Sequence, residues 1–167
     1  MTPYHPIEPD NEQACKHFVE DLDDDTYTAF IACIGSPAFN ETMKWRLREI
    51  FQYLKYNMLF KKTKVLELMA GIGRNYEVLR NYFTNIEMLE QSESMYKHIH
   101  KSVHVRKVKI QEFKWPKEEY DCVVGVWCLC YLSTYEYGVQ IKNIEESLQI
   151  GGHLILFEPV LSKREPQ

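Results

Sequence analysis

Residues 64–74 read KVLELMAGIGR, and this segment sets the architecture expected for the chain. Residues 64–69, which are mostly apolar, predict a buried strand, and residues 70–73 predict a tight turn that leads into a helix. The helix that follows carries apolar side chains on one face, at Tyr76, Leu79 and Phe83. A strand, glycine turn and helix in this order can hold a ligand against the backbone N–H groups of the turn.

Strands and helices continue to alternate after this unit. Further strands are expected at 85–89, 103–110, 120–127 and 154–157. One helix should run from Ser92 to near His100, and another from Ser133 to the glycine pair at 151–152. Because residues 120–127 are nearly all apolar, we expect that strand to be central. The pattern predicts an α/β, Rossmann-like three-layer sandwich around a mostly parallel sheet of about five strands.

The residues before the glycine turn form a separate part of the pattern. The first ten carry three prolines and predict an irregular arm, followed by two short helical segments before Gly35. Asn40 can cap the next helix, whose apolar stripe extends to Met58. We therefore divide the chain into an N-terminal arm and helical cover, residues 1–60, and a Rossmann-like domain, residues 61–167.

Composition excludes several classes of protein. The 167 residues suit one ordinary domain, and the net charge of −4 opposes direct binding to nucleic acid. The five cysteines are odd in number and lack paired CxxC motifs, so we expect no disulfide framework and no metal site. We expect neither a membrane-spanning segment nor a signal peptide. These features favour a reducing compartment, cytoplasmic or nuclear.

Chemistry in such a sheet is expected at the carboxyl ends of the strands. There Glu67, Gly71 and Gly73 form the first turn, and Glu90 follows the second strand, 17 residues past Gly73. An acidic residue at that position can accept hydrogen bonds from two ribose hydroxyls, which predicts a ligand of the adenosine type. The alternative is that the glycines only make the turn and Glu90 is a solvated charge.

Two ligand classes fit that geometry, dinucleotides and S-adenosylmethionine (SAM). A dinucleotide site needs a third glycine where this chain has Tyr76. Glu67 would repel a pyrophosphate but attract the ammonium of a methionine group, and Arg74 could pair with its carboxylate. The residues favour a SAM site over the dinucleotide site of an oxidoreductase.

Five segments carry a resemblance to a known family: VLELMAGIGR, IEMLEQS, IQEF, YDCVVGVWCLCYLS and LQIGGHLILFEP. In this order they resemble the successive motifs of class I SAM-dependent methyltransferases, and they are most similar to the protein N-terminal (alpha-N) methyltransferases, which methylate X-Pro-Lys termini. The resemblance assigns the cofactor site to these residues: Gly71, Gly73 and Arg74 for methionine, Glu90 and Gln91 for ribose, Gln111 and Glu112 for adenine, and Val126 and Trp127 near the methyl group. Residues 111–113 could equally be a polar loop with one core aromatic, and Trp127 could equally be a core residue.

The sequence departs from that family at three places. Met69 replaces a small residue in the turn, and Glu158-Pro159 replaces an Asp-Asn pair that handles the substrate amine. The chain also ends at Gln167, before two further strands of the family pattern. The open edge of the fifth strand is then expected to be covered by a protein partner, by a second copy of the chain or by the N-terminal helical arm.

Two functions remain open. The first is SAM-dependent methyl transfer to a protein amine, such as a protein N-terminus, or to another acceptor, with Glu158 and Tyr131 as catalytic candidates. The second is a non-catalytic, methyltransferase-like scaffold subunit of a larger complex. His98 and His100, two residues apart, are expected at the surface.

Overall fold

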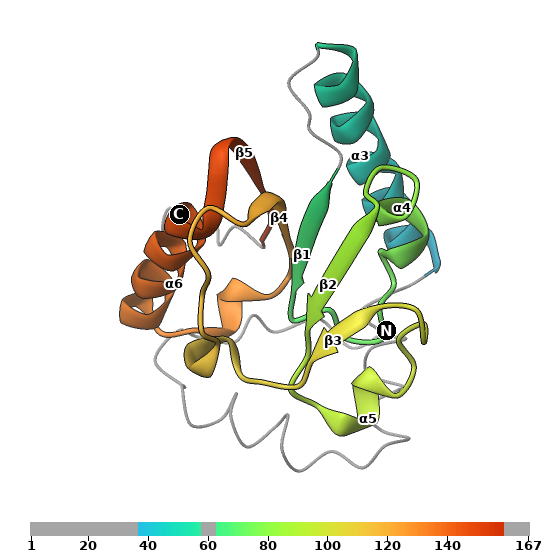
Figure 1. Cartoon of the computed structure of the whole chain (residues 1–167). Coiled ribbons are helices and arrows are strands. Elements are labelled where there is room, and N and C mark those ends of the chain that lie inside the picture. Colours follow the sequence, from blue (N-terminus) through green and yellow to red (C-terminus); the bar gives the residue numbers. More distant parts are fainter. Residues whose placement is uncertain (1–36, 58–62, 159–167) are drawn as a thin grey trace, which may run out of the picture. The chain divides into compact units, whose positions relative to one another are not determined.

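The computed structural model describes residues 37–57 and 63–158. In it, five parallel strands form one sheet (Figure 1): β1 (Lys64–Leu68), β2 (Asn85–Leu89), β3 (His104–Arg106), β4 (Tyr120–Val126) and β5 (Leu148–Phe157). Their order is β3-β2-β1-β4-β5, and every pairing is parallel. The chain thus winds outward from β1 in both directions, which places a crevice for ligands at the carboxyl ends of β1 and β4.

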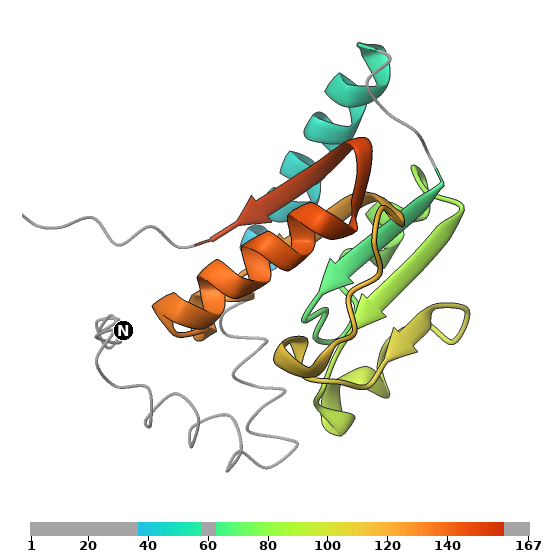
Figure 2. The ribbon, with the colours of Figure 1, turned by 60° about the vertical axis from the view of Figure 1, so that its left-hand side comes forward.

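Helices cover both faces of this sheet, as expected of a three-layer sandwich (Figure 2). On one face lie α3 (Pro37–Tyr56), α4 (Tyr76–Leu79) and the region of α5 (Glu93–Tyr96). On the other lie α6 (Thr134–Ser147) and two 3₁₀ turns, η1 (Ile110–Glu112) and η2 (Leu129–Tyr131). None of the described helices combines the length and the apolar character that a membrane span needs.

Alternation along the strands explains the two cores. Val65 of β1 packs in the cluster that contains Leu47 and Phe51 of α3, whereas the next residue, Leu66, packs in the cluster of Ile144 of α6. Successive side chains of a strand point to opposite faces, so a strand covered on both sides must be apolar throughout. The prediction that residues 120–127 form a buried inner strand is confirmed, because β4 pairs with both β1 and β5.

The compact units of the chain are Met1–Phe39 and Asn40–Gln167. The arm and short helices expected before Gly35 lie outside the described residues. The prediction that Asn40 caps the covering helix is wrong, because α3 already begins at Pro37. Proline suits the first helical position, where its missing N–H would have no partner within the helix.

Several further boundaries differ from the sequence prediction, among them the start of β5, which lies at Leu148 and not at residue 154. The expected strand at 103–110 is only the three residues of β3, and the expected helix at 92–100 is one turn, α5. The helix α6 starts after Ser133 with the expected cap, completed by Glu136, but ends at Ser147 rather than at the glycines. Gly151, with φ of 80°, lies instead where the pairing of β5 with β4 shifts register, and continuous pairing resumes at His153.

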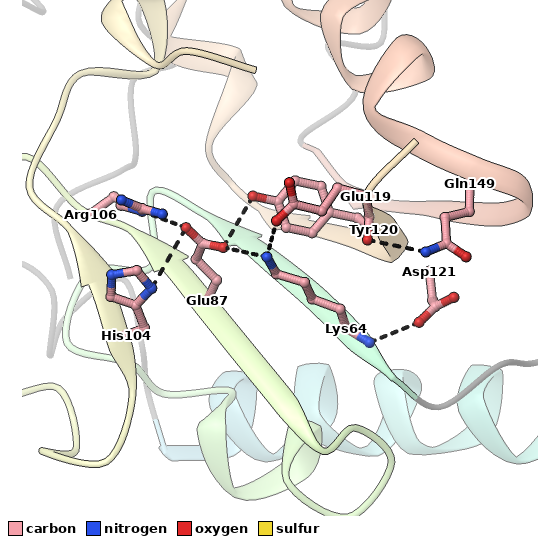
Figure 3. Close-up of polar contacts among 8 residues, drawn as sticks. All are labelled: Lys64, Glu87, His104, Arg106, Glu119, Tyr120, Asp121 and Gln149. Atoms are coloured by element: carbon pink, nitrogen blue, oxygen red, sulfur yellow. Dashed lines mark hydrogen bonds and ion pairs between the residues drawn. The ribbon is translucent and has the colours of Figure 1, made fainter. Parts of the chain in front are cut away.

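A buried carboxylate, Glu87, connects four strands of the sheet (Figure 3). One carboxylate oxygen accepts a hydrogen bond from Arg106 Nε of β3 at 2.6 Å. The other accepts one from the Tyr120 hydroxyl of β4 at 3.2 Å and pairs with Lys64 Nζ of β1 at 3.2 Å. Lys64 also pairs with Glu119. Although burial alone would raise it, the pKa of Glu87 lies below its usual value because of Arg106 and Lys64.

A second carboxylate closes the start of β1 onto β4. Asp121 Oδ2 accepts hydrogen bonds from the backbone N–H groups of Thr63 and Lys64, at 3.0 and 2.8 Å. Gln149 Nε2 donates to the carbonyl oxygen of Glu119 at 3.4 Å, which adds β5 to the same cluster. Polar groups at the amino-terminal side of the sheet are therefore used for its assembly.

The substitution Phe51→Ala tests whether α3 is part of the core. Phe51 is fully buried and packs edge-on against Phe83, with 5.4 Å between ring centroids. Its loss should lower the free energy of unfolding by about 3 to 5 kcal/mol. Tyr53→Ala, on the same helix but 65% exposed, should change it by less than about 0.5 kcal/mol. Urea unfolding followed by circular dichroism measures both, and equal effects would contradict the packing.

Candidate functional site

The turn after β1 has an unusual backbone. Met69, Gly71 and Gly73 all have positive φ, of 45°, 60° and 76°. Glycine adopts this region freely, whereas a side chain there costs about 1 to 2 kcal/mol. Met69 therefore stands in a strained conformation, at the position where the sequence resemblance calls for a small residue. The Ala70 N–H donates to the carbonyl of Leu89 at 2.8 Å, which holds the turn against β2.

The two glycines of the turn pack beneath the segment that follows β2. A Cβ atom on Gly71 would lie 3.5 Å from Met95 Cε, and one on Gly73 would lie 3.3 Å from Ile99. The first contact is ordinary and the second is tight. Conformation is therefore the main reason for glycine at both positions, with space an added constraint at Gly73.

Glu90 joins the glycine turn to the end of β2. Its carboxylate accepts hydrogen bonds from the backbone N–H of Gly71 at 2.7 Å and from that of Ser92 at 2.8 Å. The side chain is only 6% exposed, so the alternative of a solvated charge is wrong. Burial raises the pKa of Glu90, and the backbone N–H groups oppose that rise. A carboxylate has about four acceptor positions, so this one can still accept a hydrogen bond from a ligand hydroxyl.

Glu67, at the end of β1, is a buried acid with an unused acceptor. Asn75 Nδ2 donates to its Oε1 at 2.7 Å. Its Oε2 is buried without a hydrogen-bond partner, and no other side-chain nitrogen or oxygen among residues 41–57 and 63–158 shares that condition. Burial raises the pKa of Glu67 to about 7, although the Asn75 hydrogen bond and the charge of Arg74 lower it.

The hydrogen-bond acceptors of this turn fit a ligand with an ammonium group. An unpaired buried acceptor costs about 1 to 3 kcal/mol, and a cationic N–H donor would remove that cost. A pyrophosphate would instead meet two buried carboxyl groups, those of Glu67 and Glu90. Arg74 is half-buried, and its positive charge acts on Glu67.

The ends of β4 and β5 form the other side of the site. Trp127 follows β4 with φ of 52°, and its N–H donates to the carbonyl of Phe157 at 2.8 Å. The carboxylate of Glu158 accepts three backbone N–H groups of the next segment, from Cys128, Leu129 and Cys130, at 3.2, 2.9 and 3.2 Å. Glu158 therefore anchors η2 to the end of β5.

The remaining residues predicted from sequence also lie at or after the carboxyl ends of strands. Gln111 and Glu112 are exposed on η1, and Gln111 Nε2 donates to Glu136 of α6 at 3.3 Å. Tyr131, on η2, is 44% exposed, Val126 and Trp127 are half-buried, and Gln91 is exposed. His98 and His100 are exposed as predicted, although they lie in turns after α5 and not on a helix.

Two groups that take part in the site were not identified from sequence. Asn75 precedes α4, where asparagine usually caps a helix, but its side chain binds Glu67 instead. Ser92 was expected to cap a helix, whereas its backbone N–H binds Glu90 and its side chain makes no cap bond. A polar residue next to a glycine turn is the only signal of either role.

Comparisons with known proteins identify the fold but not the family. No protein-family model matches the chain, and no curated protein matches it. Solved structures do match: a SAM-dependent methyltransferase of Leishmania major has a TM-score of 0.72 at 16% identity, over 89% of this chain and 62% of that one. An amino pentose methyltransferase of Micromonospora echinaspora, solved with SAM bound, has a TM-score of 0.63 at 17% identity, over 75% of this chain and 53% of that one.

A sugar N-methyltransferase of a Streptoalloteichus species also matches, with a TM-score of 0.58 at 17% identity, over 69% of this chain and 47% of that one. The chain thus spans roughly half to three-fifths of the length of these structures. It has the Rossmann-like fold of class I SAM-dependent methyltransferases. The finer resemblance to protein N-terminal methyltransferases stays a prediction.

Glu67 should make folding stability depend on pH. Its pKa rises from 4.5 to about 7 on folding, so the folded state keeps a proton that the unfolded state loses. The contribution of this proton to folding stability is complete below pH 4.5 and is lost as pH rises toward 7. Between these values the wild type should lose about 3 kcal/mol more than Glu67→Gln, which cannot ionise. Urea unfolding at several pH values measures the difference.

The matched control is Glu77→Gln, which removes an exposed carboxylate on α4. Its pH profile should follow that of the wild type. An identical profile for Glu67→Gln would show that Glu67 is ionised in the folded protein at pH 5 to 6, contrary to its burial.

Proposed function

We propose that the chain binds SAM at the carboxyl ends of β1 and β2 and directs its methyl group to an amine. The observation that carries this proposal is the unpaired, buried Oε2 of Glu67 beside a turn of positive-φ glycines. The methionine ammonium of SAM offers the donor that this oxygen lacks. The solved structures that share the fold are named as SAM-dependent enzymes, which supports the same ligand.

We assign each part of SAM to residues at the carboxyl ends of the strands. Gly71, Gly73 and Arg74 take the methionine end, with Arg74 opposite its carboxylate. Glu90 and Gln91 take the ribose hydroxyls, for which Glu90 is already held in place by two backbone N–H groups. The other residues assigned to the ligand are Gln111 and Glu112 for the adenine, and Val126 and Trp127 near the methyl group.

Bound SAM supplies a methyl group on a sulfonium, which is electrophilic without further activation. The protein then has to hold a neutral amine in line with that group and exclude competing water. Tyr131, a partly exposed phenol on η2, is the candidate to orient the amine. Glu158 holds the backbone of that segment, so its part in the reaction is to position Tyr131 as well as to offer a carboxylate to the incoming amine.

An amine acceptor is favoured by the chemistry of the site and by its neighbours. A carboxylate and a phenol can accept hydrogen bonds from an amine that has already lost its ammonium proton to solvent, and can so orient its lone pair. Two of the matching structures are named as an amino pentose methyltransferase and a sugar N-methyltransferase. We propose a protein amine, with a free protein N-terminus as the leading case.

A non-catalytic scaffold is the second candidate. The observation in its favour is that Glu158 is already bound by three backbone N–H groups, while Met69 brings a large side chain to a strained position in the turn. In that case the edge of β5, the last strand of the described sheet, is the place for a protein partner or a second copy.

Cofactor binding is tested by isothermal titration calorimetry with SAM and, for comparison, with NAD. We expect saturable SAM binding with a Kd on the order of micromolar and no heat with NAD. Glu67→Gln should weaken SAM binding about tenfold, because it replaces a charged acceptor of the ammonium by a neutral one. Glu90→Ala should weaken it further.

Glu93→Gln, an exposed carboxylate on α5, is the control and should bind SAM as the wild type does. Circular dichroism shows whether each variant is folded. A folded wild type that binds no SAM would contradict both the enzyme and any scaffold that depends on SAM.

Methyl transfer is tested with SAM that carries a labelled methyl group and a peptide that begins X-Pro-Lys. We expect label on the free peptide and none on the same peptide with an acetylated N-terminus. Tyr131→Phe should lower kcat about tenfold with little change in the Kd for SAM, since it alters the acceptor side alone. If the free peptide stays unlabelled while a protein from cell extract takes the label, the acceptor proposal is wrong. If SAM binds and nothing is labelled, the scaffold is favoured.

A further inference from the structure

A basic segment lies at the edge of the sheet opposite β5. Residues 97–109 read KHIHKSVHVRKVK, with four lysines, one arginine and three histidines, and no Asp or Glu stands between Glu93 and Glu112. All eight of these basic side chains are exposed. The segment carries a formal charge of +5, so the net charge of −4 leaves −9 on the remaining residues. Charge is therefore strongly segregated in this chain.

The segment runs from the end of α5 through β3 to η1, as Figure 1 shows. β3 pairs with β2 on one side and is the last strand of the described sheet on the other. Two of the basic residues face the buried Glu87. Arg106 Nε lies 2.6 Å from its Oε1, and His104 Nδ1 lies 3.9 Å from the same oxygen. For Lys101, Lys107 and Lys109, the structure gives no ion pair with a carboxylate of the described residues.

Lysines on an edge strand can serve simply to prevent strands of other molecules from pairing with it. That reading accounts for the strand itself, His104–Arg106, which contains a single formal positive charge. It does not account for Lys97 and Lys101 before the strand or Lys107 and Lys109 after it. Extra positive charge on both sides of an open edge favours attraction of a partner with the opposite charge.

We propose that the edge formed by residues 97–109 binds an extended, acidic polypeptide segment of another protein. The backbone of such a segment pairs with the open edge of β3, as in strand addition, and its carboxylates pair with Lys101, Lys107 and Lys109. This surface does not depend on methyl transfer, and it is separate from the edge of β5.

Two points favour an acidic polypeptide over a nucleic acid. Only a polypeptide carries the regularly spaced N–H and C=O groups that extend a strand ladder. The nearby aromatic rings also offer no open stacking platform, because Lys107 Nζ lies 3.5 Å from the centre of the Tyr96 ring and His100 stacks on Tyr76 at 4.8 Å.

The test uses a fluorescent peptide of about twelve residues that alternates Glu and Thr, at low salt, with anisotropy as the readout. We expect the peptide to bind, and to bind more weakly as salt increases. The triple variant Lys101→Gln, Lys107→Gln and Lys109→Gln should reduce affinity about tenfold or more. Hydrogen exchange should show slower exchange at residues 104–107 when the peptide is bound.

The matched control removes three exposed lysines elsewhere, by Lys55→Gln, Lys117→Gln and Lys142→Gln, and should keep the affinity of the wild type. Equal loss in both triple variants would overturn a specific surface. An oligouridylate of similar charge that binds more tightly than the peptide, without protection of β3, would assign the edge to nucleic acid instead. If neither probe binds, the proposal is wrong, and the lysines serve only to prevent strands of other molecules from pairing with β3.

Discussion

The whole sheet depends on neutralising one buried charge. Glu87 sits in the middle of β2, 1% exposed, where a lone carboxylate would cost several kcal/mol. Lys64, Arg106 and Tyr120 reach it from β1, β3 and β4, so a single side chain fixes the relative position of four strands. Arg106 and Lys64 lower the pKa of Glu87, whereas burial and the contact with Glu87 raise the pKa of Tyr120. The ionic cluster specifies the alignment of short strands that backbone pairing alone would define weakly.

Glu67 shows the opposite solution on the neighbouring strand. By alternation its side chain points to the other face of the sheet from Glu87, and its polar contacts are Asn75 and the charge of Arg74. Its pKa rises to about 7, because these contacts compensate burial only in part. The same kind of side chain therefore stabilises the fold where its partners are complete and marks a candidate site where one oxygen lacks a partner. Position along the strand decides which, since Glu67 stands at a carboxyl end and Glu87 does not.

Where burial on both faces imposes an apolar run, sequence was sufficient to predict the structure. β1, β2 and β4 fall within one residue of their predicted bounds, and the order of elements follows from alternation. The prediction failed for β3 because an edge strand makes half the pairings and its apolar residues, such as Ile110, are used by the turn that follows. It also could not show that Asn75 binds Glu67, or that Glu158 binds η2, since both contacts join residues that are brought together only by the folded loops.

The anchoring of Glu158 bears on what kind of catalyst this edge could be. The carboxylate of Glu158 accepts hydrogen bonds from three backbone N–H groups, and moving it away to act as a mobile base would leave those donors without a partner. These three hydrogen bonds instead fix the segment between Trp127 and Tyr131. Methyl transfer from a sulfonium makes small demands on acid–base chemistry and large ones on alignment, so a rigid acceptor side suits it.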